Sequence, residues 1–316
     1  MKENLSTTTS ITSTYAGEFA GQYIQAMLLA SKTLGDGLIT IKPNIAYKQI
    51  VKKLATASLL QDAACDFTAT GTVTLTERIL EPKQIMVNLQ LCKKDFISDW
   101  ESINMGYSSF KNLPKNFSDF LIGNISASVG ASIETSIWQG ITGVTGTFEG
   151  FCYKFKADSD VNDISGTTIT SSNVQAELAK VVAKLATLKI FNQGEKPIIY
   201  CATDVISNYL ISLGGYSASG VGANGYKGEG PNQIYPQKLY FAGIELVEAP
   251  GLATSEMVGA QPDNLWFGTG LMSDHNKVQV LDMADLDGSD NVRFISRFSA
   301  GVQYGIGEEI VYYWIY

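Results

Sequence analysis

Apolar and polar residues alternate over the C-terminal part of the chain, as they do in strands with one buried face. A short apolar strand is predicted at 265–268, followed by strands at 277–281, 292–298 and 308–316. A Gly/Asp/Asn-rich turn at 287–291 joins the second and third of these, which is typical of a β-hairpin. Because free termini usually fray unless a sheet holds them, we expect the C-terminal end to be a structural member of the fold.

An N-terminal arm is predicted for residues 1–60. Residues 1–15 are rich in Ser and Thr, and residues 17–34 carry apolar side chains at helical spacing. A short strand at 38–41 follows. A second short helix is predicted next, with Tyr47, Ile50, Val51 and Leu54 as its apolar positions.

Residues 72–92 read as one long β-hairpin, because Val73 and Leu75 alternate with Thr and a second alternating run ends at Leu91. Four charged residues crowd around Pro82 at its centre: Glu77, Arg78, Glu81 and Lys83. A two-stranded ribbon is marginally stable alone in water, so we expect it to lie on a neighbouring surface. The ribbon is therefore a candidate interaction element.

A long helix is predicted over 117–141 from an apolar residue at every fourth position between Leu121 and Ile137. Gly and Ser lie between these positions and lower the helix propensity, so tertiary contacts must hold this helix. A glycine-rich exit over 140–150 follows.

Helices and strands then alternate over 165–260, which predicts a compact α/β lobe inserted between the long helix and the terminal strands. Its predicted helices are 170–190 and 204–213, its strands 197–202, 239–241 and 244–247, and its glycine-rich loop 214–236.

The chain has 316 residues, 45% of them hydrophobic, with a formal net charge of −8. This size allows one large core or two modest ones. The acidity argues against a protein whose surface grips a nucleic-acid backbone, and no apolar stretch is long enough to span a membrane. The first sixty residues are mildly basic, with six Lys and three acids. The lysines are Lys2, Lys32, Lys42, Lys48, Lys52 and Lys53, and the acidic residues are Glu3, Glu18 and Asp36.

Catalytic and metal-binding patterns are absent or weak. His275 is the only histidine and lies in a polar turn, and the acidic loop containing Asp158, Asp160 and Asp163 is expected to be solvated. Residues 220–225 match G-x-G-x-x-G, but they lack the preceding strand and following helix of a dinucleotide site.

A calcium loop is not predicted at 285–288, because Met283 occupies the first ligand position. The four cysteines, Cys65, Cys92, Cys152 and Cys201, are expected to be buried reduced thiols, with a Cys65–Cys92 disulfide as the alternative. We therefore predict no enzyme activity, no cofactor and no metal.

In this order, the arm, charged ribbon, long helix, inserted lobe and terminal strands resemble the major capsid protein of tailed double-stranded DNA bacteriophages, which has the Hong Kong 97-type coat fold. The pieces that carry the resemblance are 133–140 leading to 147–151, together with 264–268 and 297–305. Residues 74–78 and 87–93 are similar to the coat proteins of crAss-like phages.

The resemblance implies an α+β fold with four parts. These are an arm over 1–60, an extended β-hairpin loop over 61–98, a peripheral domain over 99–164 and 261–316 with a spine helix at 117–141, and an axial domain over 165–260. The loop would overlap a neighbouring subunit, and residues 214–236 would lie near the capsomer axis. The expected inter-subunit contacts are Glu77, Arg78, Glu81, Lys83, Gly220, Gly222 and Gly225.

The implied function is mechanical. Hexamers and pentamers of the chain would form an icosahedral shell around packaged double-stranded DNA, assembled in the host bacterial cytoplasm with scaffold, portal and auxiliary or decoration proteins, and with no membrane partner. The acidic body is expected to make only weak, non-specific contact with the DNA. Three alternatives stay open: an encapsulin-type shell around cargo enzymes, a small-oligomer enzyme that uses the α/β lobe, and a decorating or portal-associated protein.

Overall fold

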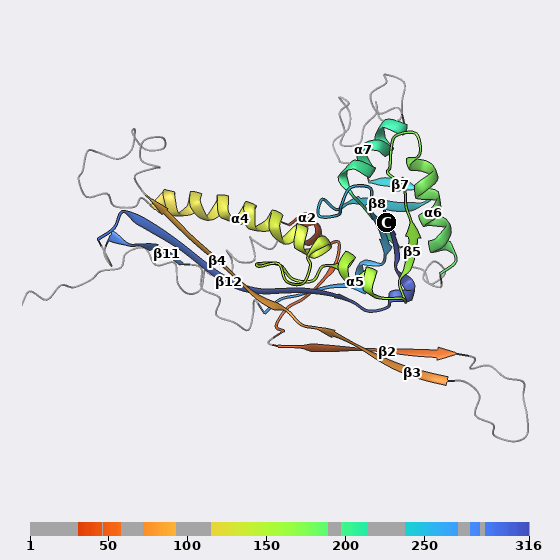
Figure 1. Cartoon of the computed structure of the whole chain (residues 1–316), viewed down its shortest axis with the longest axis horizontal. Coiled ribbons are helices and arrows are strands. Elements are labelled where there is room, and N and C mark those ends of the chain that lie inside the picture. Colours follow the sequence, from red (N-terminus) through yellow and green to blue (C-terminus); the bar gives the residue numbers. More distant parts are fainter. Residues whose placement is uncertain are drawn as a thin grey trace, which may run out of the picture.

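The computed structural model describes residues 31–45, 47–57, 72–92, 115–188, 197–213, 238–270, 279–284 and 288–315. Figure 1 shows a compact α/β lobe, an elongated lobe built of long strands beside one long helix, and a two-stranded ribbon that projects from the elongated lobe. His275, the G-x-G-x-x-G run and the predicted helix before Ser31 lie outside the described residues.

The elongated lobe contains a sheet of five strands within the described residues, in the order β1-β10-β12-β11, with β4 also paired to β12. Its strands are β1 (Thr40–Lys42), β4 (Lys83–Cys92), β10 (Leu265–Gly268), β11 (Gln279–Asp282) and β12 (Asn291–Tyr304). Along β12, Val292, Phe294 and Phe298 are buried, whereas Arg293 and Arg297 are exposed on the opposite face. This alternation is the sequence pattern that predicted the terminal strands.

Helix α4 (Lys115–Gln139) runs along β4 and β12 (Figure 1), close to the helix predicted over 117–141. Its side chains Ile125, Ile133 and Ile137 are buried in the same core cluster as the apolar face of β12. The helix ends against a very close backbone contact, because a Cβ built on Gly140 would lie 1.9 Å from the carbonyl oxygen of Phe148. The predicted glycine exit therefore has a steric cause.

The α/β lobe contains six strands among the described residues, in the order β5-β13-β9-β6-β8-β7. They are β5 (Asn162–Ser165), β6 (Ile198–Cys201), β7 (Leu239–Phe241), β8 (Ile244–Glu248), β9 (Met257–Ala260) and β13 (Val311–Trp314). Helix α6 (Val174–Ala186) packs on β5 and β13, and α7 (Thr203–Ser212) packs on β8. The helices and strands predicted between 170 and 247 are confirmed.

Strand β13 was predicted to belong with the terminal strands, but it pairs with β5 and β9 in the six-stranded sheet. The short 3-10 helix η4 (Gly307–Glu309) separates β13 from β12. A second such turn, η3 (Pro262–Asn264), leads from β9 into β10. Both connections carry the chain from one sheet to the other, so each lobe contains residues from distant parts of the sequence.

Aromatic side chains join the two sheets through helix α5 (Phe151–Ala157). The ring of Phe155 lies 5.1 Å from that of Tyr304 on β12 and 5.6 Å from that of Tyr312 on β13. Trp138 at the end of α4 continues the row, 5.5 Å from Phe151. Tilted pairs of this kind add about 0.5–1.5 kcal/mol each beyond the burial of their surface.

The start of the described chain is held by a buried carboxylate on α4. Glu134 is 5% exposed and accepts hydrogen bonds from Ser31 Oγ at 2.5 Å, Thr33 Oγ1 at 2.5 Å and the Thr33 amide at 2.9 Å. The indole of Trp138 donates to Thr33 Oγ1 at 3.0 Å. The short helix α2 (Lys32–Gly35) is thereby fixed to α4, and Lys32 also pairs with Glu248 on β8.

Two predictions near the N-terminus, one of a helix and one of a hairpin, were wrong. The segment predicted as a second helix is strand β2 (Gln49–Ala57), which pairs antiparallel with β3 (Thr72–Leu80). The predicted hairpin between β3 and β4 does not form, because β4 pairs with β12 over ten residues from Lys83 to Cys92. In this pairing Ile85, Val87 and Leu91 pack against the core, and the Glu81–Pro82 step lets the two strands diverge.

Three of the four cysteines lie in the described residues, and each is a free thiol. Cys152 and Cys201 are buried, as predicted, and burial raises the pKa of both thiols. Cys92, the last residue of β4, is half-buried and not buried as predicted, and Cys65 falls outside the described residues. Across the described ranges, no helix is long and apolar enough to cross a membrane.

Candidate assembly surface

The β2–β3 ribbon is the most prominent projection of the described chain (Figure 1). Its register places Ile50 opposite Ile79 and Lys52 opposite Glu77 on one face. Directly opposed residues of an antiparallel pair share a face, so Leu80 and Arg78 lie on the other. The two faces at the base of the ribbon have different surroundings.

The outward face carries exposed apolar side chains. Ile50 is 54% exposed and Ile79 is 47% exposed, although they lie directly opposite each other across the strands. Lys52 and Glu77 form a 3.3 Å ion pair beside them on the same face. Burying an Ile side chain contributes about 1.5–3 kcal/mol, so this pair favours association with another surface.

The inward face is anchored to the body of the protein. The side chain of Leu80 is fully buried, and Arg78 donates a 2.5 Å hydrogen bond to Asp158, which follows α5. The Arg78 guanidinium also lies 4.3 Å from the ring centroid of Tyr304 on β12, a distance typical of a cation–π contact. Asp158, predicted to be a solvated loop residue, is instead half-buried in this contact because Arg78 reaches it from the ribbon.

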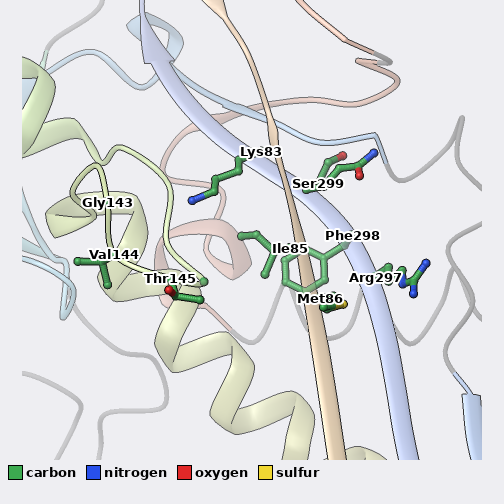
Figure 2. A pocket seen from close by; sticks show the side chains of 11 residues that line it. Lys83, Ile85, Met86, Gly143, Val144, Thr145, Arg297, Phe298 and Ser299 are labelled. Carbon is green, nitrogen blue, oxygen red and sulfur yellow. The ribbon is translucent and has the colours of Figure 1, made fainter.

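The junction between β3 and β4 carries two more of the predicted contact residues. Glu81 forms a 2.8 Å ion pair with Lys48 at the start of the ribbon. The Nζ of Lys83 donates a 2.8 Å hydrogen bond to the carbonyl of Thr147, in the loop that follows α4. The ammonium group of Lys83 points toward this loop in Figure 2.

A groove of about 740 Å³ lies between β4, β12 and the loop 143–146 (Figure 2). Its lining includes Ile85, Met86 and Phe298, with the cationic side chains of Lys83 and Arg297. A second groove of about 490 Å³ adjoins it at Lys83 and Gly143, and reaches Ile79 on the ribbon. Met86 is 60% exposed, so the first groove presents apolar side chains beside its two cationic ones.

The structure brings Glu77, Arg78, Glu81 and Lys83 together around the base of the ribbon, and gives each an intrachain partner. Gly220, Gly222 and Gly225 lie outside the described residues. Sequence reasoning missed the exposed Ile50–Ile79 pair, because Ile50 was placed on a helix. Residues 49–53 do not alternate between apolar and polar side chains, so the local pattern alone does not indicate a strand there.

The described residues contain no group of three or more His, Cys, Asp or Glu side chains arranged to hold a metal ion. Their strongest polar clusters, around Glu134 and around Arg78, consist of hydrogen bonds between parts of the fold. The surface features that stand out are the ribbon and the grooves at its base. They are suited to contact with another macromolecule.

No protein-family model matches the sequence, and no curated protein matches it at a significant level. Solved structures do match the fold. The capsid of the native GTA particle superposes with a TM-score of 0.58 at 11% identity, over 91% of this chain and 90% of that chain. The procapsid of satellite phage P4, which includes the size determination protein Sid, gives a TM-score of 0.56 at 11% identity. The match covers 92% of this chain and 97% of that chain.

The capsid of Myoviridae phage XM1 gives a TM-score of 0.56 at 13% identity, over 89% of this chain and 90% of that chain. At these identities the likeness concerns the fold, and it extends over nearly the whole length of each protein. The predicted α+β class and a capsid-type fold are thereby confirmed. The chain has the fold of tailed-phage capsid proteins.

Proposed function

We propose that this chain is the major capsid protein of a tailed double-stranded DNA bacteriophage, related most nearly to those of crAss-like phages. The observation that carries the proposal is the match to capsid structures over about nine-tenths of both chains. A protein that shared one domain with a capsid would leave a large part of one chain unmatched. The proposed role is structural, without catalysis or a cofactor.

In this proposal the chain forms hexamers and pentamers that tile an icosahedral shell. The elongated lobe with α4 as its spine is the peripheral domain, and the α/β lobe over 162–260, completed by β13, is the axial domain, with Gly220, Gly222 and Gly225 near the capsomer axis. The overlapping element is the β2–β3 ribbon, in place of the hairpin expected at 61–98. Glu77, Glu81 and Lys83 are the proposed direct contacts with a neighbour.

The exposed Ile50–Ile79 face supports an overlap with a second copy of the chain. An isolated ribbon is marginally stable, and a neighbouring surface would both stabilise it and bury its apolar side chains. Because each subunit in a shell would give and receive one such contact, many weak contacts would add up to a stable particle.

The remaining partners follow from the same proposal. Scaffold, portal and auxiliary or decoration proteins would act with this chain in the host bacterial cytoplasm, and the mature location would be the virion. With a net charge of −8, the protein would enclose DNA through weak, non-specific contact.

Sedimentation and negative-stain electron microscopy of the purified full chain, alone and with candidate scaffold proteins, test the proposal. Closed shells or capsomer rings are the expected result. Small uniform shells that hold a cargo enzyme instead of a nucleic acid would favour the encapsulin alternative. A monomer or dimer that never assembles would contradict both readings and favour an enzyme or a decorating protein.

A further inference from the structure

Arg78 is the charged side chain that ties the ribbon to the body. It extends from β3 on the inward face of the ribbon, and its Nη2 reaches Asp158 Oδ2 at 2.5 Å and Asp160 Oδ2 at 3.8 Å. The Arg78 and Asp158 side chains are only 24% and 19% exposed, so solvent screens their interaction less than it screens a surface pair. The contact joins residues that are eighty positions apart in the sequence.

The surroundings of Arg78 fix the orientation of its side chain and also pair its charge. Its guanidinium stacks on the ring of Tyr304, whose hydroxyl donates to the same Asp158 oxygen at 2.6 Å. A Cβ on Gly307 would come within 3.3 Å of Arg78 Nη2 and 3.2 Å of Asp158 Oδ2, so the space around the pair is closely filled. A planar, forked donor that stacks on an aromatic ring is held in one orientation more firmly than a lysine would be.

Two further contacts of β3 lie beside Arg78. The amide of Gln303 on β12 donates to the Ile79 carbonyl at 2.9 Å, and the buried Leu80 side chain packs beside Gly268 on β10. Strand β2 follows β3 through their nine-residue pairing. The last three residues of β3 therefore join the ribbon to the body, beside the chain that enters β2, where the Ile45 amide donates to the Thr269 carbonyl.

We infer that Arg78 is a positioning residue, which sets the direction of the ribbon by its contact with Asp158 and Tyr304 instead of by binding a neighbouring subunit. This inference rests on the proposed function, in which the ribbon must meet a second copy. A strand of nine residues is about 30 Å long, so a swing of about 10° at its base moves its far end by about 5 Å. A displacement of that size separates two complementary surfaces.

The direction of the ribbon is measurable in the isolated subunit, without assembly. Nitroxide labels are placed at Ala57→Cys, at the far end of β2, and at Ala179→Cys, an exposed position on α6. The background carries Cys65→Ser and Cys92→Ser, and keeps the buried Cys152 and Cys201. Double electron–electron resonance then gives the distribution of distances between ribbon and body.

We expect a narrow distribution in the parent, and one that is broadened or shifted by about 5 Å in Arg78→Ala and in Asp158→Asn. Arg78→Lys keeps the charge but loses the fork and the stacking, so it is expected to restore the parent distribution only in part. Lys48→Ala is the matched control, because it removes an ion pair of similar length within the ribbon base. Near-ultraviolet circular dichroism verifies that each variant is folded. If Arg78→Ala does not fold, the test uses Asp158→Asn, which preserves the shape of the side chain.

An unchanged distribution in the folded Arg78→Ala or Asp158→Asn subunit would overturn the inference. In assembly trials, the Arg78→Ala chain is expected to give few or misshapen shells, and the Lys48→Ala chain normal ones. If the parent itself never assembles, the proposed function fails, while the distance measurement still decides the role of Arg78. Normal Arg78→Ala shells from a subunit with an altered ribbon would refute the link between ribbon direction and assembly.

Discussion

The hydroxyl of Tyr304 and the guanidinium of Arg78 both donate to one oxygen of Asp158, at 2.6 and 2.5 Å. Burial acts to raise the pKa of Asp158, but the hydrogen bonds from Tyr304, the Asp160 amide and Arg78 outweigh it and lower the pKa. A carboxyl whose pKa is lowered by folding stabilises the folded state above its unfolded pKa of about 4. That contribution is lost as the pH falls through the lower folded-state value.

Replacing Asp158 by Asn should therefore change the pH dependence of stability. At neutral pH we expect Asp158→Asn to lower the free energy of unfolding by roughly 1–3 kcal/mol, because Arg78 loses its charged partner. The difference from the parent should shrink as the pH falls below about 4, where the parent carboxylate is also neutralised. Urea unfolding over a series of pH values measures it, with the more exposed Asp160→Asn as the control. A difference independent of pH would contradict the assignment.

The exposed Ile50–Ile79 pair should matter for assembly and little for the subunit. We expect Ile50→Thr with Ile79→Thr to reduce shell yield strongly, since an association surface loses two apolar side chains. The free energy of unfolding of the subunit should change by less than about 1 kcal/mol, because both side chains are half exposed already. Lys52→Thr, on the same face of the same ribbon, is the control for the substitution itself. Equal shell yields from all three chains would argue that this face meets solvent in the particle.

Long periodic segments were predictable from the sequence because their local pattern and their burial agree. Helices α4, α6 and α7 lie close to their predicted positions. The Leu265–Gly268 strand has the same bounds in the prediction and in the structure. In each case one face is buried in the core, so the apolar spacing reports directly on the structure. The charged residues around Pro82 were predicted to lie at the tip of a hairpin, but they lie where β3 and β4 diverge toward different partners.

The ribbon was misassigned because pairing partners are a property of the whole fold. Residues 49–57 carry apolar and charged residues that suit either a short helix or a half-exposed strand, and only the presence of β3 decides between them. Strand β4 has an alternating pattern that fits β3 as well as β12, so the pattern alone does not reveal its ten-residue pairing with β12. Asp158 was missed for a related reason, since its partner Arg78 lies eighty residues earlier in the chain.

Glu134 is expected to be the polar group whose loss most weakens the attachment of the N-terminal segment. In Glu134→Gln, one acceptor oxygen becomes an NH₂ donor that faces donors of Ser31 or Thr33. Leaving buried donors without acceptors costs roughly 1–3 kcal/mol each. Urea unfolding measures the change, and Glu149→Gln, at a more exposed ion pair with Lys154, is the control. If both variants lose the same free energy of unfolding, the buried hydrogen bonds of Glu134 contribute no more than an exposed ion pair, and the prediction is contradicted.

Gly140 should tolerate no side chain, because the backbone of Phe148 occupies the space where a Cβ would lie. Gly140→Ala places that atom 1.9 Å from the Phe148 carbonyl oxygen and 2.6 Å from the Ser136 carbonyl oxygen, and neither backbone can move away freely. The two backbone segments are also joined by a hydrogen bond, because the Gly150 amide donates to the Gly140 carbonyl at 2.8 Å. We expect a loss of roughly 3 kcal/mol or more in the free energy of unfolding, the range of severe overpacking. Ser132→Ala, exposed on α4, is the control. A Gly140→Ala chain as stable as this control would show that the backbone around Gly140 and Phe148 can move apart to admit a side chain.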